Sequence, residues 1–124
     1  MRTGRNSRGT GLQAEEQALR FLEDRGLNRV ERNFSSRRGE IDLVMQDQDT
    51  LVFVEVRFRR STSFGSAAES VTGSKQQRII QAASHFLCSR RQWRDYPCRF
   101  DVLAISGGLR QRIDWIRDAF RANF

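Results

Sequence analysis

Apolar residues recur at helical spacing in two segments of the chain. From Leu12 to Arg25 they occupy the i, i+4, i+7 and i+8 positions of an amphipathic helix, at Ala14, Ala18, Phe21 and Leu22. Gly26 follows where a C-cap glycine is expected. A second helix, of about 16 to 18 residues, is predicted after the capping residue Thr72. Its apolar stripe consists of Ile79, Ile80, Ala83, Phe86 and Leu87.

Five other segments have the composition and patterning of β-strands. They are residues 27–34, 40–46, 50–60, 99–105 and 112–116. In residues 40–46 the alternation predicts that Ile41, Leu43 and Met45 share one face. Residues 50–60 begin with a nearly continuous apolar run, which is typical of a central strand covered on both faces. A final amphipathic turn through Ala119 and Phe120 is predicted to be helical.

The predicted elements follow the order α-β-β-β-α-β-β-α, which favours one α/β domain with a mixed sheet flanked by helices. The chain length, 124 residues, fits a single domain. Residues 1–10 are basic and polar and show no apolar period. We therefore expect a flexible basic tail over residues 1–10 and a single domain over residues 11–124.

Composition narrows the setting in which the protein works. The longest apolar runs have four residues, far fewer than the roughly 20 that a membrane helix needs. The basic residues 1–11 contain no apolar stretch that could serve as a secretory signal. The two cysteines form no CxxC motif. We therefore expect no membrane partner, and a cytoplasmic location with free thiols.

The net charge of +7 is unevenly distributed along the sequence. Residues 39–56 contain five acidic residues and no basic one, whereas residues 57–99 contain nine basic and two acidic residues. An acidic island between basic segments fits a protein that holds a cation in a pocket and polyanions around it. Solvated polar turns among ordinary surface arginines are the alternative interpretation.

Three residues form the most informative constellation. Asp42 lies on one predicted strand, and Glu55 and Arg57 lie two residues apart on the next, so Glu55 and Arg57 point to the same face. If these strands pair as a hairpin, Asp42 and Glu55 can converge. A carboxylate within so apolar a strand needs a compensating cation. That cation is either a metal of the Mg²⁺ or Mn²⁺ type or an arginine in a structural ion pair.

The motifs that carry these residues resemble a known family. GEIDLV (39–44) and VFVEVRFRR (52–60) look like the YraN-type family, relatives of Holliday-junction resolvases in the PD-(D/E)XK restriction-endonuclease-like superfamily. The resemblance extends to Gly11, Glu15 and Ala18, to SVTGSKQQR (70–78) and to CRFDV (98–102). It implies a restriction-endonuclease-like fold and a homodimer as one candidate assembly.

The resemblance also implies roles for individual residues. Asp42 and Glu55 would bind Mg²⁺ or Mn²⁺, and Glu15 would be the helical acid of the catalytic site. Arg57 stands where the family motif has lysine. Arginine can orient an oxyanion, but with a pKa above about 12 it does not act as a base. The only lysine, Lys75, is interpreted as a surface residue near a helix N-terminus, with a reach into the site as the alternative.

Basic side chains surround the acidic island and predict a nucleic-acid partner, with DNA favoured by the resemblance. Arginine forks suit phosphates, and phosphate contacts supply most non-specific affinity. The candidate contacts are Arg37, Arg38, Arg59, Arg60, Lys75 and Arg78. The leading hypothesis is an endonuclease-like protein that hydrolyses phosphodiesters in structured or branched DNA. The alternatives are a catalytically impaired nucleic-acid-binding module and a protein-interaction domain whose acids form structural ion pairs.

Overall fold

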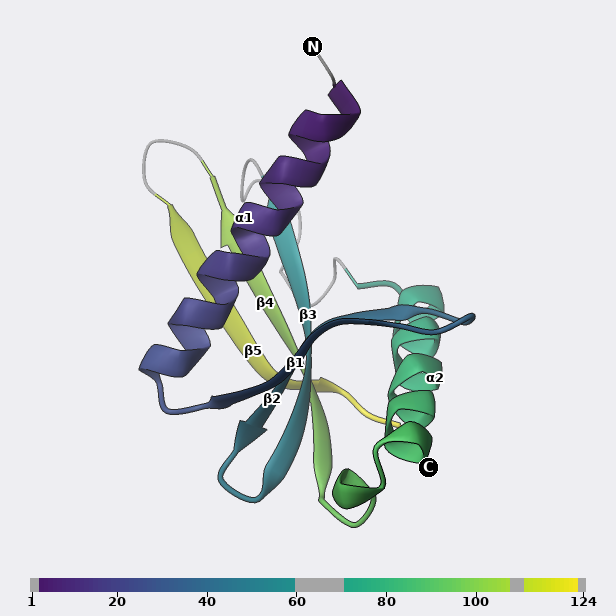
Figure 1. Cartoon of the computed structure of the whole chain (residues 1–124). Helices are drawn as coiled ribbons and strands as arrows, with labels where there is room; N and C mark the ends of the chain where they lie inside the picture. Colours follow the sequence, from purple (N-terminus) through teal and green to yellow (C-terminus); the bar gives the residue numbers. More distant parts are fainter. Residues whose placement is uncertain (1–2, 60–70, 108–110, 123–124) are drawn as a thin grey trace.

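A five-stranded sheet and two long helices form the described part of the chain, which in this computed structural model comprises residues 3–59, 71–107 and 111–122 (Figure 1). The helices are α1 (Thr3–Asp24) and α2 (Gly73–Ser89), and a short 3₁₀ turn, η2 (Arg91–Trp93), follows α2. The strands are β1 (Asn28–Ser35), β2 (Glu40–Asp47), β3 (Thr50–Arg59), β4 (Cys98–Ser106) and β5 (Arg112–Phe120).

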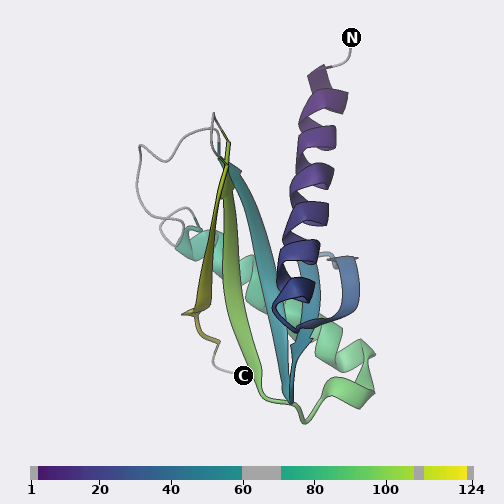
Figure 2. The same ribbon diagram turned by 90° about the vertical axis from the view of Figure 1, so that its left-hand side faces the viewer.

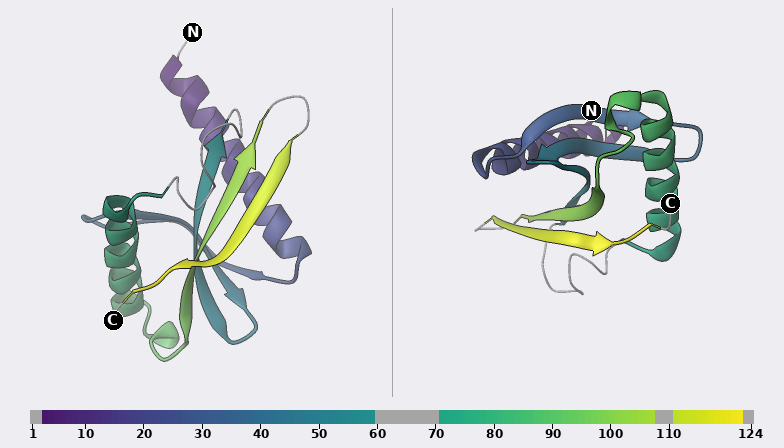
Figure 3. Two further views of the ribbon diagram at one scale, coloured as in Figure 1. Left: turned by 180° about the vertical axis from the view of Figure 1, so that it is seen from behind. Right: turned by 90° about the horizontal axis from the view of Figure 1, so that it is seen from below.

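The sheet is mixed and its strands lie in sequence order. Strands β1, β2 and β3 form an antiparallel meander, β4 runs parallel to β3, and β5 is antiparallel to β4 at the edge of the sheet (Figure 3). The connection between the parallel strands β3 and β4 contains α2, as parallel strands require a crossover. The predicted α/β architecture, a mixed sheet flanked by helices, is therefore confirmed.

Each helix packs on its own hydrophobic cluster, and β3 contributes to both. Val52 and Val54 belong to the cluster that contains Ala18 and Leu22 of α1. The alternate residues of β3, among them Phe53, belong to the cluster that contains Ile79 and Phe86 of α2. Because neighbouring strand residues point to opposite faces, α1 and α2 cover opposite faces of the sheet. The prediction of a strand over residues 50–60 that is covered on both faces is confirmed for Thr50–Arg59, and residue 60 lies outside the described residues.

Strand β2 departs from the predicted alternation at its beginning. Leu43 and Met45 pack in the α1 cluster as expected, but Ile41 packs in the α2 cluster together with Val44. The register explains this difference, because β2 pairs with β3 only from Leu43 onward and pairs only with β1 before that point. The β1–β2 hairpin therefore leaves the plane of the sheet and reaches α2 (Figure 1).

The C-terminal segment is a strand where a helical turn was predicted, and that prediction is wrong. Strand β5 continues to Phe120, whose ring stacks on Phe100 of β4 at 5.1 Å between centroids. The β4–β5 register shifts between Phe100 and Val102, opposite a bulge that holds Asp118 at a φ of 53°. The bulge breaks the two-residue alternation at that point, so the last residues of β5 do not follow a strand pattern in sequence.

Helix α1 also begins earlier than predicted. It starts at Thr3 rather than at Leu12, so residues 3–10, which were predicted to form a tail, are helical. No proline interrupts the first 24 residues, and a helix can continue through glycine at a cost of about 1 kcal/mol each. The N-terminal end of α1 extends beyond the ends of the strands (Figure 2).

The described residues also address the predictions about membrane helices and free thiols. Neither helix is both long and apolar enough to cross a membrane. Cys88 is exposed and Cys98 is partly buried, and both thiols are free.

Candidate active site

The divergence of β2 from β3 creates the candidate site. The last paired residues of the two strands are Leu43 and Val54. Beyond this pair the two strands separate. Glu55 is the next residue of β3, and Asp42 is the corresponding residue of β2. The Asp42 Oδ2 atom accepts a hydrogen bond from the backbone N–H of Val56 at 2.8 Å. The carboxylate thus takes the position of a missing ladder partner, which fixes it at the opening between the strands.

Glu55 is the buried acid of the site, with only 5% of its surface exposed. Its Oε2 atom lies 3.0 Å from Nζ of Lys75 on α2 and 3.6 Å from Nη1 of Arg57 on β3. Two side-chain cations therefore contact Glu55, and the lysine is the nearer one. Lys75 lies near the N-terminus of α2 with its side chain 39% exposed, but it is not only a surface residue. The alternative, a reach into the site, describes its contact with Glu55.

Asp42 and Glu55 face each other closely enough to affect each other's charge. Burial and the negative charge of Glu55 raise the pKa of Asp42 to about 7, and the Val56 N–H opposes that shift. A side-chain hydrogen bond with Glu55 also raises the pKa of Asp42, since the bond needs a proton on one of the two carboxyl groups. A buried carboxyl group beside a second carboxylate is a place where a cation is favoured.

Both carboxyl groups line a polar cavity of about 410 Å³. Its other walls are the turn between β1 and β2 and the first two turns of α2. The lining residues are Ser36, Arg37, Arg38, Gly39, Glu40, Asp42, Glu55, Lys75, Arg78 and Ile79. The predicted contacts Arg37, Arg38, Lys75 and Arg78 are therefore brought together around the two predicted metal ligands.

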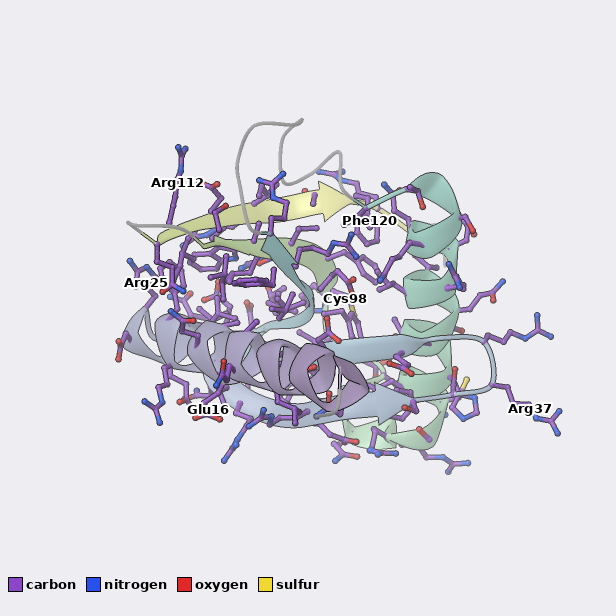
Figure 4. The ribbon with its side chains drawn as sticks, turned by 90° about the horizontal axis from the view of Figure 1, so that it is seen from above. Glu16, Arg25, Arg37, Cys98, Arg112 and Phe120 are labelled. Atoms are coloured by element: carbon purple, nitrogen blue, oxygen red, sulfur yellow. The ribbon has the colours of Figure 1, made fainter. Side chains whose placement is uncertain are left out.

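The β1–β2 turn is held rigidly against α2. The Ser36 hydroxyl donates to the Gly39 carbonyl and accepts from the Arg38 N–H, both at 3.2 Å. A Cβ atom on Gly39 would lie 2.5 Å from the Arg78 carbonyl oxygen, so only glycine allows the turn to approach the helix this closely. Figure 4 shows Arg37 pointing outward from the tip of this turn.

Glu15 of α1 lies near the site but outside the cavity lining. Its Oε1 atom is 3.7 Å from Nη2 of Arg32 and accepts no hydrogen bond within the described residues. Burial raises the pKa of Glu15, and the side chains of Asn33 and Arg32 oppose that shift. The charge of Glu15 in turn raises the pKa of Asp42. Glu15 thus influences the carboxylate pair electrostatically from the other face of the sheet.

The remaining predicted contacts are not part of the cavity. Arg59 lies at the end of β3, where its carbonyl accepts from the Gly107 N–H at 2.7 Å, and it is absent from the described lining. Arg60 lies outside the described residues. Sequence reasoning missed Ser36, Gly39, Glu40 and Ile79 as lining residues. A glycine directly before the EID motif was the available signal for the close approach of the turn.

The donor set fits a divalent cation held by two protein ligands. No group of three or more His, Cys, Asp or Glu side chains is arranged around a metal position in the part of the chain that the structure describes. Mg²⁺ is commonly held by one or two carboxylates and otherwise by water and substrate phosphates. Asp42 and Glu55 meet that requirement. Burial and the negative charge of Glu55 raise the pKa of Asp42, and a cation would offset both effects.

The chain is similar to proteins of one family over most of its length. A family model described as uncharacterised protein family UPF0102 matches residues 14–105. A UPF0102 protein of Stutzerimonas stutzeri is 52% identical over 117 residues, which is 94% of this chain and 98% of that protein. One of Saccharophagus degradans is 54% identical over 114 residues, 92% of this chain and 94% of that protein. The matched range contains Glu15, Asp42, Glu55 and Lys75.

Proposed function

The chain belongs to the UPF0102 family, which is the YraN family that its motifs resemble, and from this premise we propose that it is a nucleic-acid-binding endonuclease. Its substrate would be the phosphodiester backbone of structured or branched DNA. The observation that carries the proposal is the placement of Asp42 and Glu55 face to face in a cavity rimmed by cations. Such convergence of acids inside a basic rim is what metal-assisted phosphodiester hydrolysis requires.

The rim supplies the affinity for the backbone. No acidic side chain lies within ion-pair distance of Arg37, Arg38 or Arg78 in the described segments of the chain. Their guanidinium groups remain available for phosphate oxygens, to which arginine can donate two parallel hydrogen bonds. The side chains of Arg37 and Arg38 are exposed on this rim, so they can contact a phosphate at the mouth of the cavity.

The carboxylate pair supplies the chemistry. A divalent cation bound between Asp42 and Glu55 would polarise the scissile phosphodiester and lower the pKa of an attacking water. Asp42 is held in place for this role by the Val56 N–H at 2.8 Å. The burial of Glu55 fixes the second ligand, since a side chain with 5% exposure has little freedom to rotate.

We infer that Lys75 supplies the function that the motif gives to its lysine, although it comes from α2 and Arg57 occupies the motif position. The Nζ atom of Lys75 contacts Glu55 at 3.0 Å and lines the cavity, so it lies beside the position of a phosphate bound there. An ammonium group at that place can orient the attacking water and stabilise the negative charge that develops on the phosphate. Arg57 contributes a second, more distant positive charge at 3.6 Å from Glu55. The lysine function would thus come from α2, while Arg57 remains on β3.

One observation favours a second candidate function, a nucleic-acid-binding module without cleavage. Lys75 and Arg57 together already neutralise Glu55. If Lys75 holds Glu55 when DNA is bound, the carboxylate pair has no place for a metal. The rim would then bind DNA while the acids serve only the fold.

Incubation of the purified protein with branched and linear DNA separates the two functions. With Mg²⁺ or Mn²⁺ we expect cleavage that EDTA abolishes. Glu55→Gln and Asp42→Ala should each lose at least about a hundredfold in rate, which corresponds to about 2.7 kcal/mol of transition-state stabilisation. The exposed Glu23→Gln variant on α1 is the matched control and should cleave like the wild type. Tight binding without cleavage in the wild type would support the binding module instead.

Lys75→Met tests the assignment of the lysine. It should lower the cleavage rate by about tenfold to a hundredfold while it retains metal binding, because the amine acts beside the carboxylates and not as a ligand. Lys75→Met at the wild-type rate would contradict the role of Lys75 and leave the carboxylate site intact.

A further inference from the structure

A second hollow lies on the other side of the β1–β2 turn. It has a volume of about 400 Å³ and shares Ser36, Arg37 and Arg38 with the active-site cavity. The turn residues therefore form a ridge between two depressions. The opposite wall of the second hollow consists of α2 residues, namely Gln81, Ser84, His85 and Cys88.

The two hollows follow one face of α2. Lys75 and Arg78 line the active-site cavity, and Gln81, His85 and Cys88 line the second hollow. At 3.6 residues per turn, the positions from Arg78 to Cys88 lie within about 80° of one another around the helix axis, and Lys75 lies about 60° from Arg78 at the N-terminal end of this stripe. From Lys75 to Cys88 the helix rises by about 20 Å at 1.5 Å per residue. That length corresponds to about six nucleotides at the 3.4 Å spacing along one strand of B-DNA.

The chemistry of the second hollow suits an anion. Its described lining includes two arginines and the polar groups of Ser84 and Gln81, and it includes no acidic residue. A third hollow, near the start of β4, provides the contrast. Two of the three arginines in its described lining are paired there, Arg121 with Asp118 at 2.8 Å and Arg99 with Asp47 at 3.0 Å. No acidic side chain among residues 3–59, 71–107 and 111–122 pairs with the arginines of the second hollow, so their charge is available to a ligand.

We propose that the second hollow binds the phosphodiester backbone of the nucleic-acid strand that leaves the active-site cavity. The strand passes over the ridge at Arg37 and Arg38 and continues along α2 past Ser84. This inference rests on the proposed function, since it extends the path of the same substrate. The rigid turn, held by the Ser36 hydrogen bonds and by the close approach of Gly39 to Arg78, keeps the two hollows at a fixed separation.

Placing a negative charge in the second hollow tests this path. Ser84 is exposed in the middle of α2, so Ser84→Glu adds a charge without removing a core contact. The matched control is Gln13→Glu, an exposed position on α1 at the other face of the sheet. For both full-length variants, the equilibrium dissociation constant for a labelled duplex of about 20 base pairs is measured at salt concentrations from about 50 to about 200 mM. Thermal melting of both variants verifies that they are folded.

We expect Ser84→Glu to bind DNA about tenfold more weakly than Gln13→Glu. The slope of the logarithm of its binding constant against the logarithm of salt concentration should be smaller by about one, which corresponds to one lost phosphate contact. The cleavage rate at saturating DNA should change less than threefold, because the carboxylate pair is untouched. Equal affinities of the two variants would overturn the inference about the second hollow. If the wild type still cleaves DNA in that case, the proposed function stands. Wild-type protein that does not bind DNA at all would overturn both.

Discussion

Two buried acids lie one residue apart in the register of neighbouring strands, yet their surroundings differ completely. Glu55 of β3 is paired with Val102 of β4, and Asp101 of β4 is paired with Val54 of β3. Asp101 is fully buried and its carboxylate is saturated with donors. Its Oδ1 accepts from Arg99 Nε at 3.0 Å and from the Asp118 N–H at 2.9 Å, and its Oδ2 accepts from Trp115 Nε1 at 2.9 Å.

The acids Asp42 and Glu55, on the face that α2 covers, have fewer partners and open onto a cavity. Asp42 accepts one backbone hydrogen bond, and Glu55 contacts two side-chain cations at 3.0 and 3.6 Å. The comparison shows what separates a structural acid from a candidate functional one. A structural acid has fixed donors on every oxygen, whereas a functional acid keeps a position for a ligand and shares its charge with a second acid.

The largest effect should come from breaking the saturated acid. In Asp101→Asn the amide nitrogen must face a donor whichever way it is turned, since both carboxylate oxygens accept hydrogen bonds from N–H groups. We expect a loss of about 3 to 5 kcal/mol in the free energy of unfolding, measured by denaturant titration. A loss below about 1 kcal/mol would show that the donors are not needed for stability.

Removal of the charge of Asp42 should stabilise the fold at neutral pH, whereas removal of the charge of Asp101 destabilises it. The pKa of Asp42 is raised from 3.8 to about 7, so the folded state binds a proton there that the unfolded state releases. Between about pH 4 and pH 7 the wild type should therefore lose stability as pH rises. Asp42→Asn removes this dependence and should be more stable than the wild type at pH 8 by about 2 to 4 kcal/mol. Parallel stability curves for the two proteins from pH 4 to pH 8 would contradict the shift.

A milder change to the saturated acid sharpens the comparison. Trp115→Phe keeps an aromatic ring against Phe21 but removes the indole N–H that binds Asp101. We expect a loss of about 1 to 2 kcal/mol, seen as a lower melting temperature, because one oxygen of a buried carboxylate loses a donor. DNA cleavage should be unchanged below the melting transition, whereas a matching loss of cleavage would mean that the two acids are coupled.

The smallest effect should follow the exchange of Arg57 for the lysine of the family motif. Arg57 lies farther from Glu55 than Lys75 does, and Lys75 already supplies an amine. Arg57→Lys should therefore change the cleavage rate by less than about tenfold, measured under single-turnover conditions. A gain of a hundredfold would show that the site lacks its amine in the wild type and that Lys75 does not replace it.

The sequence predicted those features that depend on local pattern. The apolar stripe of α2 and the apolar run of β3 were sufficient to locate both elements, because their periods are uninterrupted. The convergence of Asp42 and Glu55 followed from the hairpin alone, since two adjacent antiparallel strands bring such positions together.

Features that depend on tertiary placement could not be predicted in this way. The contact between Lys75 and Glu55 spans the crossover from β3 to α2, and its distance depends on where the helix packs. The bulge at Asp118 hides the continuation of β5, because its positive φ interrupts the alternation. The packing of Ile41 on the α2 side required knowing that β2 leaves β3 at Leu43.

Calorimetric titration of the protein with Mn²⁺ tests most directly whether the open carboxylate pair is a metal site. We predict saturable binding of one ion to the wild type and to Glu23→Gln, and its loss in both Asp42→Asn and Glu55→Gln. Binding that persists in these two variants, or no saturable heat with the wild type, would contradict the assignment of Asp42 and Glu55 as metal ligands.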